Sequence, residues 1–381
     1  MKIKKYNLIF FILIFFNFLI SIPYFIYGIY KKKISSFNVG LFFALLQSKF
    51  HPLEKSYDIR KYLELLNNFD LYKEYFNGSN KDYYVKCIIR LINYFQLKEE
   101  YLVFITSFLG YYLLYKAYIL IINKRKSYYF FIIIFSIPLL AFSGIRFFLA
   151  TAICIYGMVL HIFKKDFKGI IYILFSILVH NTMLIVAVIY ILMLFIKKLN
   201  FNIYLPWLIL FFFFDFIKLD GCLIGLVNTF NNIAGKVYFY PYAYLDSDSS
   251  KYTINIFKSL NLIGFLYNYF LLYCRKTLLL FYICFSKKKK EKNIIYILTI
   301  LIFFLQRYLI IFERFSFLVN LLILYFISAE KKKMKFFNIF IFGTIAYDTL
   351  IYLYDFKYHF ISLLFDYKDI YKYSLFKFLF M

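Results

Sequence analysis

Apolar residues occur along the chain in runs of roughly 17 to 25, and short groups of lysines separate these runs. A helix of that length crosses a hydrocarbon core about 30 Å thick, and continuous apolar runs favour helices over a barrel. We therefore predict an all-α, polytopic integral membrane bundle with about twelve spans, within a range of about 11 to 13. The expected spans lie near residues 7–30, 34–50, 100–122, 127–143, 145–163, 167–180, 181–196, 201–219, 254–274, 293–312, 315–329 and 335–354.

Basic residues form clusters that fall on alternate connections between the expected spans. The clusters lie at residues 124–126, 164–168, 197–198, 275–292 and 331–335. Because cytoplasmic loops carry an excess of Lys and Arg, we assign these clusters to the cytoplasm. Two long polar segments, about residues 51–99 and 220–253, are then predicted to be extracytoplasmic loops.

The orientation of the N-terminus depends on the weak span at 34–50. The N-terminus lies outside if this segment crosses the membrane, and inside if it does not. The lysines at 31–33 favour the first arrangement, which we prefer, whereas the lysines at 2, 4 and 5 favour the second.

The composition favours one large membrane domain over several soluble ones. Hydrophobic residues make up 63% of the 381 residues, which leaves too little polar surface to cover water-soluble domains. The net charge of +26 does not indicate nucleic-acid binding, because the basic residues lie at the ends of apolar runs. The five cysteines show neither a CxxC pair nor metal-ligand spacing. We predict a single transmembrane domain over 1–381, with no metal and no cofactor.

Isolated charged and imidazole side chains at the ends of apolar runs are the candidates for chemistry. Arg146, His180 and Arg314 are each expected at an outer junction between spans. Arg307 precedes Arg314 by seven residues, so on a continuous helix both would lie within about 20° of one side. An arginine binds phosphate oxygens through its planar fork and stays charged. The alternatives are snorkelling anchors, an ion pair between Arg314 and Glu313, and a turn-stabilising role for His180.

Four segments resemble the signature of the EpsG family, whose members are Wzy-like polymerases of exopolysaccharide and O-antigen. They are, in chain order, Asp58-Ile-Arg-Lys-Tyr62, Ser143-Gly-Ile-Arg146-Phe-Phe-Leu-Ala150, His180-Asn-Thr-Met-Leu and Arg314-Phe-Ser. The resemblance extends over most of the chain in the expected order. The chain departs from the family pattern at Phe147, where the family usually has Gln, and before Asp58, where Ser-Tyr replaces Gly-Thr.

The resemblance implies a GT-C-like fold and a glycosyltransferase in the bacterial cytoplasmic (inner) membrane. Such an enzyme would join polyprenyl-diphosphate-linked oligosaccharide units of O-antigen, capsule or exopolysaccharide on the extracytoplasmic face. Its partners would be these lipid-linked glycans, membrane lipids, a flippase and a chain-length regulator. Two other functions stay open, a flippase for lipid-linked oligosaccharides and a membrane acyltransferase that modifies sugars.

The candidate residues take roles from the chemistry of such a transfer. Negative charge develops on the diphosphate leaving group, so Arg146 and Arg314, supported by Arg307, are expected to bind it. The acceptor hydroxyl loses its proton, which calls for a general base. His180, with an ordinary pKa near 6.5, is the preferred base and Asp58 the alternative. Tyr62 is expected to orient the sugar.

Overall fold

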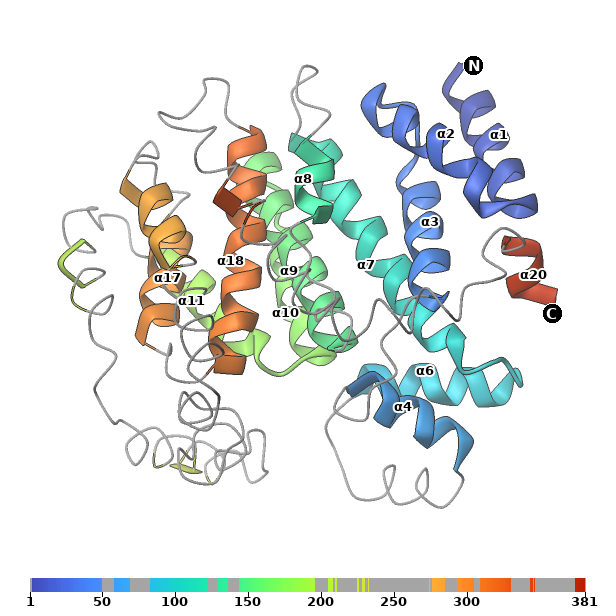
Figure 1. The fold of residues 1–381 in the computed structure, drawn as a ribbon. Coiled ribbons are helices and arrows are strands. Elements are labelled where there is room, and N and C mark those ends of the chain that lie inside the picture. The colour runs from blue at the N-terminus through green and yellow to red at the C-terminus, as the bar shows by residue number, and fades with distance from the viewer. Residues whose placement is uncertain are drawn as a thin grey trace, which may run out of the picture. The chain divides into compact units, whose positions relative to one another are not determined.

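The computed structural model describes residues 2–49, 58–68, 83–121, 129–135, 144–195, 293–304, 309–329 and 374–380, with short stretches within 205–284 and 343–346. Within these ranges every regular element is a helix (Figure 1). The helices are α1 (Lys2–Phe16), α2 (Phe18–Tyr30), α3 (Ser36–Lys49), α4 (Asp58–Asn67), α6 (Tyr83–Tyr94), α7 (Glu100–Ile121), α8 (Tyr129–Phe135), α9 (Ile145–Lys164), α10 (Lys168–Val179), α11 (Met183–Phe195), α17 (Asn293–Phe304), α18 (Leu309–Ala329) and α20 (Leu375–Phe380).

Apolar helices dominate the described part of the chain. α7 and α9 are long and apolar enough to cross a membrane, and shorter apolar helices occur in α2, α3, α10, α11, α17 and α18. The all-helical part of the prediction is thereby confirmed for the described residues, and the apolar helices fit a membrane protein. The count of about twelve spans stays a prediction. The expected spans at 201–219, 254–274 and 335–354 lie almost wholly outside the described residues, as does the long loop at 220–253.

The chain forms two compact units. Met1–Leu184 and Asp348–Met381 make up the first unit, and Ile185–Tyr347 make up the second. The single transmembrane domain over 1–381 stays a prediction. Arg146 and His180 belong to the first unit, whereas Arg314 belongs to the second.

The first apolar run folds back on itself instead of forming one helix over 7–30. Asn17 interrupts the run with an extended backbone (φ −154°, ψ 118°), and its side chain accepts a 3.2 Å hydrogen bond from the Ile20 N–H. Asparagine favours N-caps over helix interiors because its side chain competes for backbone groups. α1 and α2 therefore form a hairpin, in which the rings of Phe10 and Phe25 lie 6.0 Å apart. The prediction of a single span over 7–30 is wrong.

A hydrogen-bond network joins the start of α1 to the segment between α2 and α3. Asn7 Nδ2 donates to the carbonyl of Lys33 at 3.2 Å. Asn7 Oδ1 accepts from the Ser35 N–H at 2.7 Å and from Asn38 Nδ2 at 2.9 Å. The lysines at the two ends of the hairpin consequently lie close together. With this hairpin, both lysine groups would lie on one side of the membrane, as the excess of Lys and Arg in cytoplasmic loops favours. The orientation of the N-terminus and a crossing by α3 stay predictions.

Cysteines introduced at Lys4 and Lys31 are expected to react with a membrane-impermeant maleimide from the same side of the membrane. Both lysines are exposed, and the measurement requires a variant without the native cysteines. A cysteine at the exposed Lys98, which follows α3 and precedes α7, is the control and is expected to react from the opposite side. Labelling of positions 4 and 31 from opposite sides would show that the run crosses as one helix.

The weak expected span at 34–50 is a helix, α3, that packs along α7. The rings of Phe43 and Tyr111 stack with centroids 4.1 Å apart. A Cβ at Gly40 would lie 2.8 Å from the carbonyl oxygen of Phe108, so only glycine allows this close approach of α3 and α7. α7 also contacts α9, where the rings of Tyr111 and Phe148 lie 5.2 Å apart. α7 thus connects α3 to the helix that carries Arg146.

α9 and α10 cross at two glycines. A Cβ at Gly157 would lie 2.5 Å from the carbonyl oxygen of Gly169, and a Cβ at Gly169 would meet the carbonyl oxygen of Gly157. Interfaces between membrane helices are rich in small residues because they let the backbones approach closely. The turn between the two helices includes Lys165 in the left-handed conformation (φ 57°). The antiparallel pair places the start of α9 and the end of α10 at one end, where Arg146 and His180 lie.

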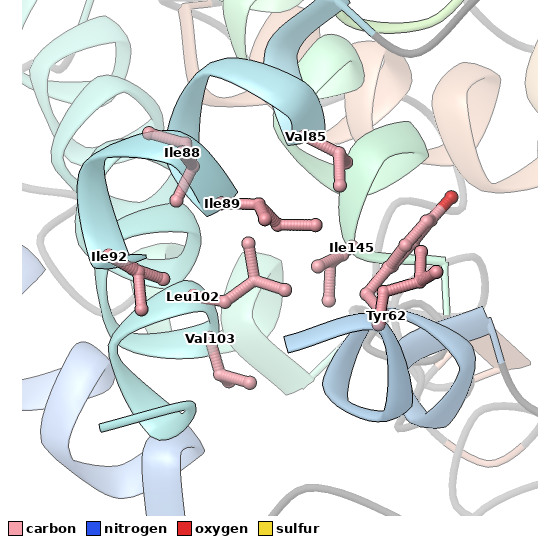
Figure 2. Close-up of a cluster of buried hydrophobic side chains, with 9 residues drawn as sticks. Tyr62, Val85, Ile88, Ile89, Ile92, Leu102, Val103 and Ile145 are labelled. Carbon is pink, nitrogen blue, oxygen red and sulfur yellow. The ribbon is translucent and has the colours of Figure 1, made fainter. Parts of the chain in front are cut away.

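The long loop predicted at 51–99 contains two helices, α4 and α6, that the apolar runs do not reveal. Figure 2 shows the hydrophobic cluster that joins them to α7 and α9, with the Tyr62 ring of α4 beside Ile145 of α9. The other members of the cluster are Leu65, Val85, Ile88, Ile89, Ile92, Leu102 and Val103. Tyr84 of α6 donates a 2.8 Å hydrogen bond to Thr106 of α7, and burial raises the pKa of Tyr84 so that its phenol stays protonated. These two helices are therefore packed against the start of α9.

Candidate functional site

Arg146 is the second residue of α9, directly after the N-cap Gly144 and Ile145. A cation in the first helical turn meets the positive end of the helix dipole, which costs about 0.3–1 kcal/mol. The same position favours a bound anion, because the first N–H groups of a helix and a guanidinium can both donate to it. The half-buried side chain of Arg146 therefore suits anion binding better than helix stability.

Tyr62 supports the guanidinium of Arg146 from α4. The Arg146 Cζ lies over the Tyr62 ring, 5.3 Å from its centroid. Such a contact contributes about 0.5–2 kcal/mol and leaves the in-plane N–H groups of the arginine directed along its edge. Tyr62 is 3% exposed within the hydrophobic cluster. In this structure the buried ring thus contacts Arg146, and a role for Tyr62 in orienting a sugar stays a prediction.

Asp58 is the first residue of α4, one helical turn before Tyr62. The structure describes the backbone at Asp58, and its side chain lies outside the described part. α4 contacts α6, which in turn contacts α7 and α10. The element that carries Asp58 is thus anchored in the same unit as Arg146.

His180 ends α10 and precedes α11. Its backbone is extended (φ −151°, ψ 118°), and its N–H donates to the Ser176 carbonyl at 3.0 Å. The half-buried imidazole is held by Thr182, whose hydroxyl lies 2.7 Å from Nδ1 and whose backbone N–H donates to Nδ1 at 3.3 Å. The carbonyl of His180 accepts from the Met183 N–H at 3.0 Å, at the first residue of α11. The turn therefore fixes both the backbone and the ring of His180.

Phe147 follows Arg146 along α9 and contacts His180. Its ring meets the imidazole of His180 edge to face, with centroids 5.4 Å apart and an interplanar angle of 83°. Phe147 directly follows Arg146 and is 4% exposed. The side chain that departs from the family pattern thus places an apolar ring against His180, where an amide would offer hydrogen bonds.

Arg314 lies inside α18 and not in a connection between two spans. α18 begins at Leu309, whereas the apolar run predicted a span from 315, so Arg314 falls in the second turn of the helix. It is half-buried. Arg307 lies outside the described residues, between the end of α17 and the start of α18. The expectation that Arg307 and Arg314 share one side of a continuous helix stays a prediction.

Two buried polar side chains follow Arg314 along α18. Ser316 and Asn320 are each 2% exposed, and within the described part of the chain Ser316 Oγ and Asn320 Nδ2 have no hydrogen-bond partner. Leaving a buried polar group unsatisfied costs about 1–3 kcal/mol. Sequence reasoning missed this pair, because serine and asparagine within an apolar run do not stand out as charged residues do.

Sequence reasoning also missed the contacts that Phe147 and Thr182 make with His180. The signal for Thr182 was present, since a polar residue two positions after a possible side-chain acceptor is typical of a turn that bonds back to that side chain. Phe147 stood out in the sequence only as a departure from the family pattern, and the spacing gave no signal of its contact with His180.

The comparison with protein families agrees with the motifs. The sequence model of the EpsG family matches residues 41–375. No match was found among curated proteins or among solved structures. The family match fits a Wzy-like polysaccharide polymerase in general and a role in exopolysaccharide synthesis. With most of its length matched and its described part built of apolar helices, this chain is a membrane protein that belongs to the EpsG family.

Proposed function

We propose that this protein is a glycosyltransferase that polymerises oligosaccharide units on the extracytoplasmic face of the bacterial inner membrane. The donor is a growing glycan on polyprenyl diphosphate, and the acceptor is a unit on a second lipid carrier. The acceptor hydroxyl forms a bond to the anomeric carbon as the bond from that carbon to the diphosphate oxygen breaks. The electron pair leaves on the diphosphate, so no nucleotide is required.

The group at the start of α9 supports this proposal most directly. Arg146 is held over the Tyr62 ring at 5.3 Å, and Phe147 connects it to His180 at the end of α10. A preformed cationic group aimed at a developing negative charge lowers the barrier because it needs no reorganisation during the reaction. Diphosphate is the anion whose charge rises in the proposed transfer. Arg314 and Arg307 of the second unit are proposed to bind the same leaving group.

Proton transfer from the acceptor completes the reaction. The hydroxyl loses its proton as it attacks, and a positioned base accelerates this step by about 10²–10⁴-fold. His180 and Asp58 are the two candidates in the first unit. A flippase and a chain-length regulator are the proposed partners, since units reach the outer face by transport and polymers of defined length require control.

The lipid-linked glycans of a deletion strain test the proposal. Loss of a polymerase leaves single units on polyprenyl diphosphate at the outer face and no long glycan. Single units retained on the inner face would instead indicate a flippase, and full-length glycan without a substituent would indicate an acyltransferase. Unchanged long glycan in the deletion strain would exclude the proposed function.

A further inference from the structure

The hydrogen bonds of His180 determine which ring nitrogen carries its proton. The backbone N–H of Thr182 donates to Nδ1 at 3.3 Å. A backbone N–H can only donate, so Nδ1 must be an acceptor. The Thr182 hydroxyl, 2.7 Å from Nδ1, can then donate to the same nitrogen. The neutral imidazole held in this way carries its proton on Nε2.

This tautomer conflicts with a role as general base. A base accepts a proton through a nitrogen lone pair, and in this tautomer Nε2 has none available. Protonating Nδ1 would place its N–H against the backbone N–H of Thr182, so both the imidazolium and the other tautomer lose this bond. The imidazole is held in place by the extended backbone of His180 and by the Phe147 ring, whose centroid lies 5.4 Å from that of the imidazole.

We propose that His180 is a neutral hydrogen-bond donor that uses Nε2–H to bind an oxygen of the lipid-linked substrate. Thr182 is the positioning residue that selects this tautomer. The inference rests on the proposed function and assigns His180 to the oxygens of the diphosphate leaving group, beside Arg146. The general-base role then falls to the other candidate, Asp58.

Variants of His180 separate the two roles. The amide nitrogen of a glutamine reaches about the position of Nε2 and donates a hydrogen bond, but a glutamine cannot accept a proton at neutral pH. Polymerisation is measured with the full chain in lipid nanodiscs and with lipid-linked units extracted from the deletion strain. His180→Ala is expected to lower the rate about 100-fold, as for removal of one preorganised donor, and His180→Gln to remain within about 10-fold of the unaltered chain.

The pH dependence gives a second activity readout. If His180 is a donor, the polymerisation rate of His180→Gln is expected to fall at low pH in the same way as that of the unaltered chain. A base role predicts that the acid limb of the unaltered chain disappears in both variants.

Nitrogen NMR of histidine tests the tautomer without activity. The chain has four histidines, and the His180 signals are those that His180→Gln removes. The expected spectrum shows an unprotonated Nδ1 and a protonated Nε2. Thr182→Val keeps the backbone N–H, so Nδ1 is expected to stay unprotonated. Loss of the hydroxyl bond is expected to shift the Nδ1 resonance, and Thr182→Ser to restore it.

The outcomes distinguish a failure of the donor role of His180 from a failure of the proposed polymerase function. If the unaltered chain does not extend the lipid-linked units, the proposed function fails. The donor role is overturned if the unaltered chain extends the lipid-linked units but His180→Gln is as inactive as His180→Ala. A protonated Nδ1 in the unaltered chain overturns the donor role as well. In both cases the proposed polymerase function still holds.

Discussion

Replacing Arg146 by alanine is expected to abolish long glycan chains and to leave lipid-linked single units at the outer face. The substitution removes the cation that Tyr62 holds at 5.3 Å, so the developing charge on the diphosphate loses its preformed partner. Loss of such a group lowers the rate by about 10²–10³-fold. The measurement is the chain-length ladder of the surface glycan, with the level of the protein in the membrane determined in parallel.

Two further substitutions serve as controls for the Arg146→Ala result. Arg90, on the exposed side of α6 in the same unit, is the matched control, and Arg90→Ala is expected to leave the ladder unchanged. Arg146→Lys keeps the charge but loses the planar fork, so an intermediate ladder is expected. Long chains from Arg146→Ala at normal protein level would contradict the site.

Alanine at Gly157 or Gly169 is expected to destabilise the first unit strongly. Each added methyl group would meet a backbone carbonyl across the α9–α10 crossing, at 2.5 Å for Gly157. A backbone carbonyl cannot rotate away as a flexible side chain can, so the helices must separate. Overpacking of this kind costs about 1–3 kcal/mol or more. The measurement is thermal unfolding of the purified protein in detergent, followed by size-exclusion chromatography.

Gly225 provides the control for the glycine substitutions. A Cβ at Gly225 would meet nothing within 4 Å, so Gly225→Ala is expected to unfold at the same temperature as the unaltered chain. If Gly169→Ala unfolds at that temperature too, α9 and α10 do not cross as closely as described. Such a result would also weaken the placement of Arg146 and His180 at one end of this helix pair.

The helices with long apolar runs were predictable from the sequence, and the interruptions were not. The limits of α7, α9 and α10 follow the expected spans because hydrophobicity alone determines them. The run at 7–30 contains a single polar interruption, Asn17, and hydrophobicity does not report that this residue caps a second helix. α4 and α6 were missed for the opposite reason, because amphipathic helices within a polar loop have no continuous apolar run.

The candidate site was partly predictable for a similar reason. Arg146 and His180 stand out because a charged or imidazole side chain in an apolar run carries an energetic cost. The support by Tyr62 and the hydrogen bonds from Thr182 depend on side-chain directions that spacing along the chain does not define. The sequence therefore identified polar groups, and the structure adds which of them hold one another.

The N-terminal hairpin also bears on how the chain enters the membrane. Moving one lysine through the hydrocarbon centre costs about 2.5–3.5 kcal/mol. Because Asn7 bonds to Lys33 and Ser35, the basic residues in the first turn of α1 and those after α2 stay at one end of the hairpin. None of them then has to be translocated. α1 and α2 can thus insert together as a loop that enters the membrane with Asn17 first. The lysines at both ends of the hairpin then stay on the side where they are synthesised.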